Sequence, residues 1–310
     1  MRTYQSFAEA YPQVLAEILS NGEPVAGVTS STSIGSGFGT RDRPFIELQG
    51  GGFRLQDPRS RQLNAGPRQP NAAFAAANFI FTLAGGHEPE MISAYNARGQ
   101  QFTEDSSRFE AAFGARLFSP GHQLAYASKK LRSDRMSRRA TALIYNPDDT
   151  LLDRRDTPCA IALQFMIRHD KLDTVCFMRS QSAAMVMPYD VFLFTMIQEW
   201  LATELGIETG TYTHIAASLH LYEEDRPLAE QVICMPNGPT TSMPPMRSAG
   251  HAVASSLIET ERCLRLAGRE PLKEQPLDEY WLSFMDPIRA VYSIPRTPRN
   301  GSAQHNDGPA

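Results

Sequence analysis

A nearly uninterrupted apolar run at residues 190–205 constrains the fold of this chain more than any other feature. Its apolar side chains are Val191, Phe192, Leu193, Phe194, Met196, Ile197, Trp200 and Leu201, and Gly206 follows the run. A helix that is apolar on every side belongs in the middle of a core. No stretch of the chain approaches the roughly 18 uninterrupted apolar residues of a membrane span, so the run predicts a buried helix.

Segments with strand-like and helix-like patterns lie on both sides of this run. Alternating apolar residues predict strands over 140–145, 159–168, 174–179 and 211–222, and residues 45–48 are also strand-like. Helical spacing predicts helices over 7–20, 71–84, 121–134 and 251–266. This order indicates an α+β fold in which a mixed sheet packs against the long buried helix. We expect one domain over residues 1–294 and a disordered polar tail over 295–310.

Composition narrows the class of protein. The chain has 310 residues, 42% of them hydrophobic, which is enough for a full core. A net charge of −4 gives no general attraction to nucleic acid or to an anionic membrane, so neither is an expected partner. Four cysteines without a C-x-x-C spacing indicate neither a zinc site nor a disulfide framework. Residues 1–20 lack a signal-peptide core, and we expect a cytoplasmic protein.

One cysteine lies where the sequence predicts a nucleophile beside a phosphate-binding arginine. Cys159 follows Asp156-Thr157-Pro158 and opens a predicted strand, and the pair Arg179-Ser180 ends the next strand. Arginine binds phosphate through charge-assisted hydrogen bonds, and a nearby cation favours the thiolate form of a cysteine. A thiol beside a fixed phosphate site suits attack on the base of a nucleotide. The alternative is a free cysteine that is buried as a small apolar side chain.

Six motifs carry a family resemblance. They are Ser137-Arg138-Arg139-Ala140, Pro158-Cys159, Gln164-Phe165, Arg179-Ser180, Pro188-Tyr189-Asp190 and Ser218-Leu219-His220-Leu221-Tyr222. Their order and spacing resemble the thymidylate synthase superfamily, which includes thymidylate synthase and the dCMP, dUMP and CMP hydroxymethylases. The resemblance covers roughly residues 76–222. It implies a thymidylate synthase-like catalytic domain, a sheet-mediated homodimer with shared active sites, and 5,10-methylenetetrahydrofolate as the one-carbon donor.

The resemblance also implies roles for individual side chains toward a pyrimidine nucleoside monophosphate. Cys159 would add as a thiolate to carbon 6 of the base, which makes carbon 5 nucleophilic. His220 and Tyr222 would bind the sugar 3′-hydroxyl. The 5′-phosphate would be held by Arg179 and Ser180, by Arg138 and Arg139 reaching across the dimer, and by Arg41 or Arg43 from the Ser- and Gly-rich segment 30–43.

Asp190 occupies the position that distinguishes the bases. Uracil-specific members of the superfamily carry asparagine there, whose amide offers one donor and one acceptor. A carboxylate only accepts hydrogen bonds, which suits the amino group of cytosine and resembles the cytosine-type hydroxymethylases. A second role for Asp190 is an N-cap of a helix that begins at Val191, and the two roles are compatible.

Several positions depart from the superfamily pattern. Asn78 stands where a glutamate relays protons near the base; it is a candidate catalytic residue whose amide can orient water but cannot exchange a proton. Phe113 replaces a tyrosine, and Ser182 replaces an aspartate that contacts the folate. Residues 292–310 show no counterpart of the tail that closes the methylating enzymes. These departures favour hydroxymethyl transfer, in which water ends the reaction, over reductive methylation.

The sequence therefore leaves three functions open. The favoured one is hydroxymethyl transfer to carbon 5 of CMP or dCMP, in which Glu104 or Asp105 takes the place of the missing glutamate. The second is methylation of dUMP by a thymidylate synthase. The third is a nucleotide-binding homologue without catalysis, which has kept the phosphate pocket and lost the proton relay.

Overall fold

A seven-stranded mixed sheet organises the chain in the computed structural model, which describes residues 1–26, 43–97, 107–118, 123–151, 156–235, 242–273 and 275–294. The strands are β1 (Arg2–Tyr4), β2 (Glu23–Val25), β3 (Phe45–Leu55), β4 (Ala140–Leu143), β5 (Ala160–Arg168), β6 (Lys171–Ser182) and β7 (Glu208–Tyr222). Their order is β1-β3-β7-β6-β5-β4, and β2 pairs with β3 outside this path. β1–β3 and β6–β7 are parallel and the other pairs antiparallel, which confirms the expected α+β class.

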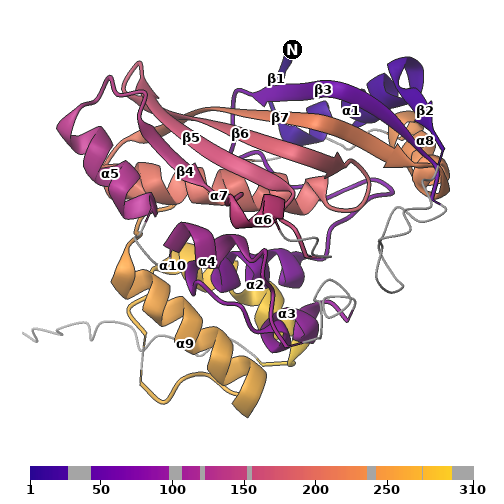
Figure 1. Cartoon of the computed structure of the whole chain (residues 1–310). Coiled ribbons are helices and arrows are strands. Elements are labelled where there is room, and N and C mark those ends of the chain that lie inside the picture. The colour runs from indigo at the N-terminus through magenta and orange to yellow at the C-terminus, as the bar shows by residue number, and fades with distance from the viewer. Residues whose placement is uncertain are drawn as a thin grey trace, which may run out of the picture.

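The long apolar run forms the central helix α7 (Met187–Leu205), which lies along one face of the sheet (Figure 1). Val191, Phe194 and Ile197 have no exposed surface, so the predicted buried helix is confirmed. The helix begins three residues before the expected start because Pro188 fits a first helical turn, where its missing N–H costs nothing. It ends at Gly206, whose φ of 70° is readily adopted only by a residue without a side chain.

A layer of helices covers the side of α7 that faces away from the sheet (Figure 1). It consists of α2 (Ala72–Leu83), α3 (Pro89–Tyr95), α4 (Phe113–Phe118), α9 (His251–Ala267), α10 (Glu279–Phe284) and α11 (Asp286–Val291). Phe79 of α2, Trp200 of α7 and Trp281 of α10 pack as a cluster in which the Phe79 ring centroid lies 6.0 and 6.1 Å from the two tryptophan rings. The central helix is therefore enclosed between two layers.

The remaining helices pack at the ends of the sheet. α1 (Phe7–Asn21) contacts β3 and α8 (Arg226–Cys234), α5 (Gln123–Ser133) contacts β4 and α7, and α6 (Asp148–Leu151) follows β4. The helices predicted over 7–20, 71–84, 121–134 and 251–266 are all present, with ends shifted by one or two residues. In the part of the chain that the structure describes, no helix is long and apolar enough to cross a membrane.

Candidate active site

Cys159 lies immediately before β5, beside the end of β6 that carries Arg179. The backbone N–H of Arg179 donates to the Cys159 carbonyl at 2.8 Å, and Arg179 Nη2 lies 3.9 Å from Cys159 Sγ. The guanidinium also donates to the carbonyls of Pro158 at 2.9 Å and Thr157 at 3.0 Å. Because β5 and β6 are antiparallel, the start of one meets the end of the other. The structure thus brings together the cysteine and the arginine that the sequence singled out.

The surroundings of the Cys159 thiol act on its ionisation in opposite directions. Burial raises its pKa, and the carboxylates of Asp190 and Asp156 raise it further. The adjacent guanidinium of Arg179 lowers it. Arg179 is therefore both the candidate phosphate ligand and the cation that favours the thiolate form required for nucleophilic attack.

Asp190 lies in the first turn of α7, partly buried and close enough to Cys159 to act on its thiol electrostatically. Gln181 Nε2 donates to Asp190 Oδ2 at 2.9 Å. Burial raises the pKa of this carboxyl to about 7, and the hydrogen bond from Gln181 opposes the rise. The expected N-cap role of Asp190 is wrong, because α7 begins at Met187 and its N-cap is Val186, whose side chain makes no capping bond. The Asp190 carboxylate is therefore available for a role other than helix capping.

His220 and Tyr222 end β7 next to this pair, and Arg43 precedes β3 on the neighbouring strand. The Arg43 guanidinium carbon lies 3.8 Å from the centre of the Tyr222 ring, and Arg43 also forms an ion pair with Glu224. The His220 and Tyr222 rings lie 5.1 Å apart. Burial raises the pKa of Tyr222, the Arg43 cation opposes the rise, and Cys159 adds to it, so the phenol lies within electrostatic reach of the thiol. Arg41 lies outside the described residues.

The other candidate phosphate ligands divide into two groups. Ser180 follows Arg179 on β6 and pairs with Ser218 on β7, so it lies at the same end of the sheet as Cys159. Arg138 and Arg139 are exposed and precede β4, whose first residue pairs with Phe165, well along β5 from the cysteine. The structure therefore does not bring this arginine pair to the Cys159 of its own chain, and its role across a dimer stays a prediction.

The departures from the superfamily pattern lie on two helices and one strand: Asn78 on α2, Phe113 on α4 and Ser182 at the end of β6. Asn78 lies in α2, partly buried, and its backbone carbonyl accepts from Thr82 Oγ1 at 2.8 Å. The Phe113 ring stacks on Phe194 of α7 at 5.6 Å, an apolar contact in place of a phenol. Ser182 Oγ accepts from the Met185 N–H at 3.4 Å. The suggested substitutes Glu104 and Asp105 lie outside the described residues, and a catalytic role for Asn78 stays a prediction.

Three buried residues behind Asp190 were missed by the sequence reasoning. Gln181 Oε1 lies 3.0 Å from His214 Nε2, and His214 Nδ1 lies 2.9 Å from the Tyr212 hydroxyl. Tyr212 and His214 are two apart on β7, so both project from the same face of that strand. Two hydrogen-bonding side chains on the buried face of a strand are a usable signal, since such groups need partners inside the protein.

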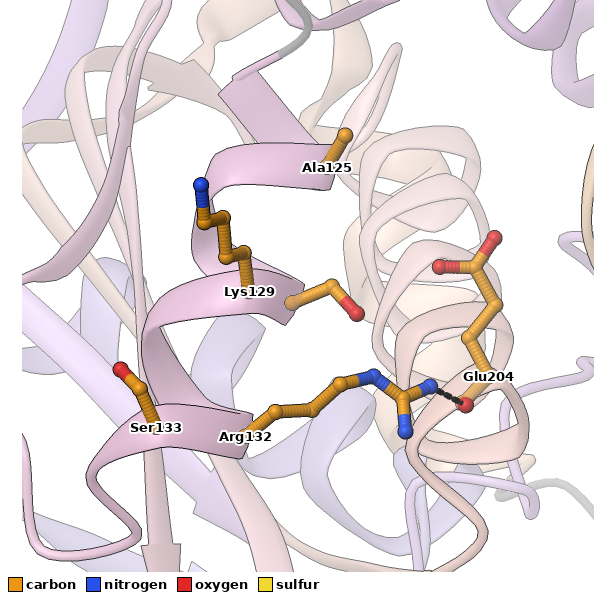
Figure 2. Close-up of a pocket in the computed structure, with 6 residues that line it drawn as sticks. Ala125, Lys129, Arg132, Ser133 and Glu204 are labelled. Carbon is orange, nitrogen blue, oxygen red and sulfur yellow. Dashed lines mark hydrogen bonds between the residues drawn. The ribbon is translucent and has the colours of Figure 1, made fainter.

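A hollow lies at the opposite end of α7 and differs chemically from the candidate site. This cavity of about 570 Å³ is lined by Ala125, Ser128, Lys129, Arg132, Ser133 and Glu204. Figure 2 shows Arg132 reaching across from α5 to the backbone carbonyl of Glu204. It contains two cations but no nucleophilic thiol, and it lies a full helix length away from Asp190. The constellation around Cys159 is therefore the better candidate for catalysis.

Comparison with known proteins agrees with this geometry. The family model for thymidylate synthase matches residues 91–250, more than half of the chain. The chain is 28% identical over 232 residues to a deoxyuridylate hydroxymethyltransferase of Bacillus phage SP01, covering 70% of the chain and 57% of the phage protein. A deoxyuridylate hydroxymethyltransferase of Delftia phage PhiW-14 is 26% identical over 190 residues, covering 55% of the chain and 51% of that protein.

A further relative is a thymidylate synthase of Bacillus subtilis subsp. natto, 33% identical over 101 residues, which are 32% of the chain and 36% of that enzyme. The chain thus spans little more than half the length of the two phage proteins. The family comprises one-carbon transferases that use methylenetetrahydrofolate as donor. The chain belongs to the thymidylate synthase family, as the six motifs predicted.

Proposed function

We propose that this chain transfers a hydroxymethyl group to carbon 5 of a cytidine-type nucleoside monophosphate, CMP or dCMP. The observation that carries the proposal is the carboxylate of Asp190, held next to Cys159 with Oδ2 bonded to Gln181. A carboxylate oxygen accepts hydrogen bonds, and the amino group of cytosine donates them. Uracil presents a carbonyl at the same place, so an acceptor there repels it.

Cys159 acts as the nucleophile. Its sulfur bonds to carbon 6 while the carbon 5–carbon 6 double bond opens, which leaves carbon 5 electron-rich. Arg179 favours the thiolate before attack and holds the 5′-phosphate through its fork of N–H donors. Carbon 5 would bond to the one-carbon unit as that unit parts from its carrier, and water would supply the hydroxyl oxygen. The proton of carbon 5 passes to a base or water, the sulfur leaves carbon 6, and the double bond re-forms.

The wall beside Asp190 fits a flat, anionic one-carbon donor. Tyr189 and Phe74 pack edge to face at 4.9 Å, and the Arg68 guanidinium carbon lies 5.4 Å from the centre of the Tyr189 ring. An aromatic pair offers surface to a planar ring system, and Arg68, whose guanidinium donates to the carbonyls of Ala184 and Met185, adds positive charge that favours an anion. These residues would hold 5,10-methylenetetrahydrofolate, which supplies a one-carbon unit at the oxidation level of formaldehyde.

The homodimer is part of the proposal because Arg138 and Arg139 are exposed and distant from the Cys159 of their own chain. We expect them to complete the phosphate site of a second subunit. Two inactive variants, Cys159→Ala and Arg139→Ala, should regain activity when refolded together, because each mixed dimer then contains one intact site. Absence of any recovery, with mixed dimers verified by mass spectrometry, contradicts shared sites.

The experiment that tests the reaction is incubation with CMP, dCMP, UMP or dUMP and methylenetetrahydrofolate, followed by mass spectrometry of the nucleotides. The expected result is one added hydroxymethyl group on a cytosine nucleotide, and its absence with Cys159→Ala. A product only from uracil nucleotides contradicts the base assignment. Nucleotide binding without any product supports the homologue without catalysis.

The second candidate function is hydroxymethyl transfer to deoxyuridylate. It is favoured by the names of the two phage relatives, both deoxyuridylate hydroxymethyltransferases. The same assay separates the two candidates, because each nucleotide is supplied alone. Carbon-5 chemistry by Cys159 is common to both, and only the reading of the base differs.

A further inference from the structure

Asp190 is the outer end of a buried chain of hydrogen bonds that leads into the sheet. Gln181 Nε2 lies 2.9 Å from Asp190 Oδ2, Gln181 Oε1 lies 3.0 Å from His214 Nε2, and His214 Nδ1 lies 2.9 Å from the Tyr212 hydroxyl. Gln181 is 1% exposed and His214 and Tyr212 are fully buried. Phe53 stacks on the His214 ring at 5.4 Å, which holds the ring in one plane. We call Gln181, His214 and Tyr212 the relay.

The hydrogen bonds of the relay can run in either of two directions, and the tautomer of His214 sets which one. Burial lowers the pKa of His214 to about 3, so the imidazole is neutral and carries a single N–H. With the proton on Nε2, His214 donates to Gln181 Oε1, and Gln181 Nε2 donates to an ionised Asp190. With the proton on Nδ1, every bond reverses: the Gln181 amide turns over, and its oxygen accepts from a protonated Asp190 at Oδ2. Both arrangements keep one hydrogen bond at each junction of the relay.

We propose that Gln181 and His214 are positioning residues that keep the free oxygen of Asp190 a hydrogen-bond acceptor in both protonation states, and so fix the base preference on cytosine. The proposal rests on the proposed function, in which Asp190 faces the base. Oδ1 makes no hydrogen bond with any residue that the structure describes. When the His214 proton is on Nε2, Asp190 is ionised and Oδ1 belongs to a carboxylate. When the His214 proton is on Nδ1, Asp190 is protonated at Oδ2 and donates to Gln181, and Oδ1 is the carbonyl oxygen of the neutral acid.

Without the relay, a protonated Asp190 could turn its O–H toward the base. A neutral carboxylic acid then offers one donor and one acceptor, the pattern that an asparagine amide presents to uracil. The protonated form is relevant at ordinary pH, because burial raises the pKa of Asp190 to about 7. The titratable groups around it are Cys159 before β5, Cys176 on β6 and Tyr212 on β7, all neutral when Asp190 titrates, and the nearby cation is Arg179.

The test compares uracil with cytosine nucleotide binding by calorimetric titration at about pH 6 and about pH 8. The wild-type preference for cytosine should be the same at both pH values. In Gln181→Met, which removes both polar contacts at similar size, the uracil-to-cytosine affinity ratio should rise about tenfold at the lower pH and return at the higher one. His214→Phe should give a smaller rise in the same direction, because Gln181 is retained but loses its anchor.

A matched control accounts for the loss of a buried glutamine as such. Gln198 on α7 is also fully buried, and its Nε2 donates to the carbonyls of Leu172 and Thr211 rather than to Asp190. Gln198→Met should leave the affinity ratio and its pH dependence unchanged. A flat ratio in both relay variants overturns the proposal, and so does a Gln198→Met ratio that changes as much as theirs.

A second measurement does not depend on nucleotide binding. In wild-type protein labelled with ¹⁵N at histidine and ¹³C at aspartate carboxyls, the His214 tautomer should change from Nε2–H to Nδ1–H with the same midpoint as the Asp190 titration. A single tautomer across that titration overturns the reversal. If the protein binds no pyrimidine nucleotide, the proposed function fails and the relay is overturned as a determinant of base preference, whereas coupled titration still identifies it as the structure that holds Asp190.

Discussion

The two ends of the central helix carry two carboxylates in contrasting surroundings. Asp190 in the first turn of α7 accepts from the neutral amide of Gln181, and Glu204 in the last turn accepts from Trp200 Nε1 at 3.1 Å beside the cation Arg132. Burial raises the pKa of both. The helix dipole favours a negative charge at the first turn and disfavours one at the last. Of the two carboxylates, Asp190 is the one linked to a buried hydrogen-bond network and to a thiol, so the first turn of α7 is the end that carries the candidate active site.

The largest expected effect comes from removing the thiol at the Asp190 end of the helix. Cys159→Ala should lower turnover by at least about a thousandfold, because it removes the thiol that we propose forms the bond to carbon 6. Tritium release from carbon 5 of labelled CMP or dCMP measures it. Cys263→Ala, a partly buried thiol on α9, is the control and should keep wild-type turnover. Equal loss in both variants contradicts the assignment of the nucleophile.

The next effect compares the arginines at the two ends of α7. Arg179→Ala should weaken nucleotide binding by about a hundredfold, since it removes a bidentate charge-assisted contact to the phosphate. Arg132→Ala removes a cation from the hollow at the other end and should leave affinity unchanged. Isothermal titration with CMP or dCMP measures both. If Arg132→Ala lowers nucleotide affinity as much as Arg179→Ala does, the assignment of the phosphate site to Arg179 is contradicted.

A smaller effect is expected on the preference for cytosine over uracil nucleotides. Asp190→Asn should shift preference from cytosine toward uracil nucleotides by roughly tenfold to a hundredfold, because an amide can donate to the uracil carbonyl. Competition between dCMP and dUMP in one reaction, read by mass spectrometry, gives the ratio directly. Glu204→Gln makes the same chemical change at the far end and should leave the ratio alone. An unchanged ratio in Asp190→Asn shows that another residue reads the base.

The smallest effect concerns stability against pH. The pKa of Asp190 is raised to about 7 in the folded protein, above its ordinary value of 3.8, so the folded state binds the proton more tightly than the unfolded state. Its contribution to the free energy of unfolding therefore falls as pH rises from about 4 to about 7. Asp190→Asn should remove roughly 1–2 kcal/mol of that fall, a figure reduced because the side chain is partly open to solvent. Urea unfolding at several pH values measures it, and an identical pH profile in both proteins contradicts the shift.

The sequence predicted elements in which a hydrophobic pattern extends over many residues. It did not predict short elements, or contacts between residues far apart in the chain. The apolar run at 190–205 predicted α7, and alternation predicted β5, β6 and β7 to within a few residues. The short helices α3, α4, α10 and α11 were missed because six or seven residues hold too little helical period.

The candidate site divides in the same way. Cys159, Arg179, His220 and Tyr222 were predicted from motifs, and the structure brings them to one end of the sheet. The bond between Gln181 and His214 joins residues 33 apart on two strands, a pairing that depends on register and could not be read from either segment. Asp190 was expected to cap its helix because the start of α7 was placed too late, and the structure gives its carboxylate to Gln181 instead.

The strand order β7-β6-β5 has a consequence for how the protein loses activity. Cys159 and the candidate ligands Arg179, Ser180, His220 and Tyr222 are attached to the neighbouring strands β5, β6 and β7. The amides of such inner strands exchange with solvent only when a large cooperative unit opens. Heat inactivation should therefore follow the same time course as loss of the sheet, without an earlier phase in which the site melts alone. Hydrogen exchange should accordingly be slowest at the same backbone positions that hold the chemistry.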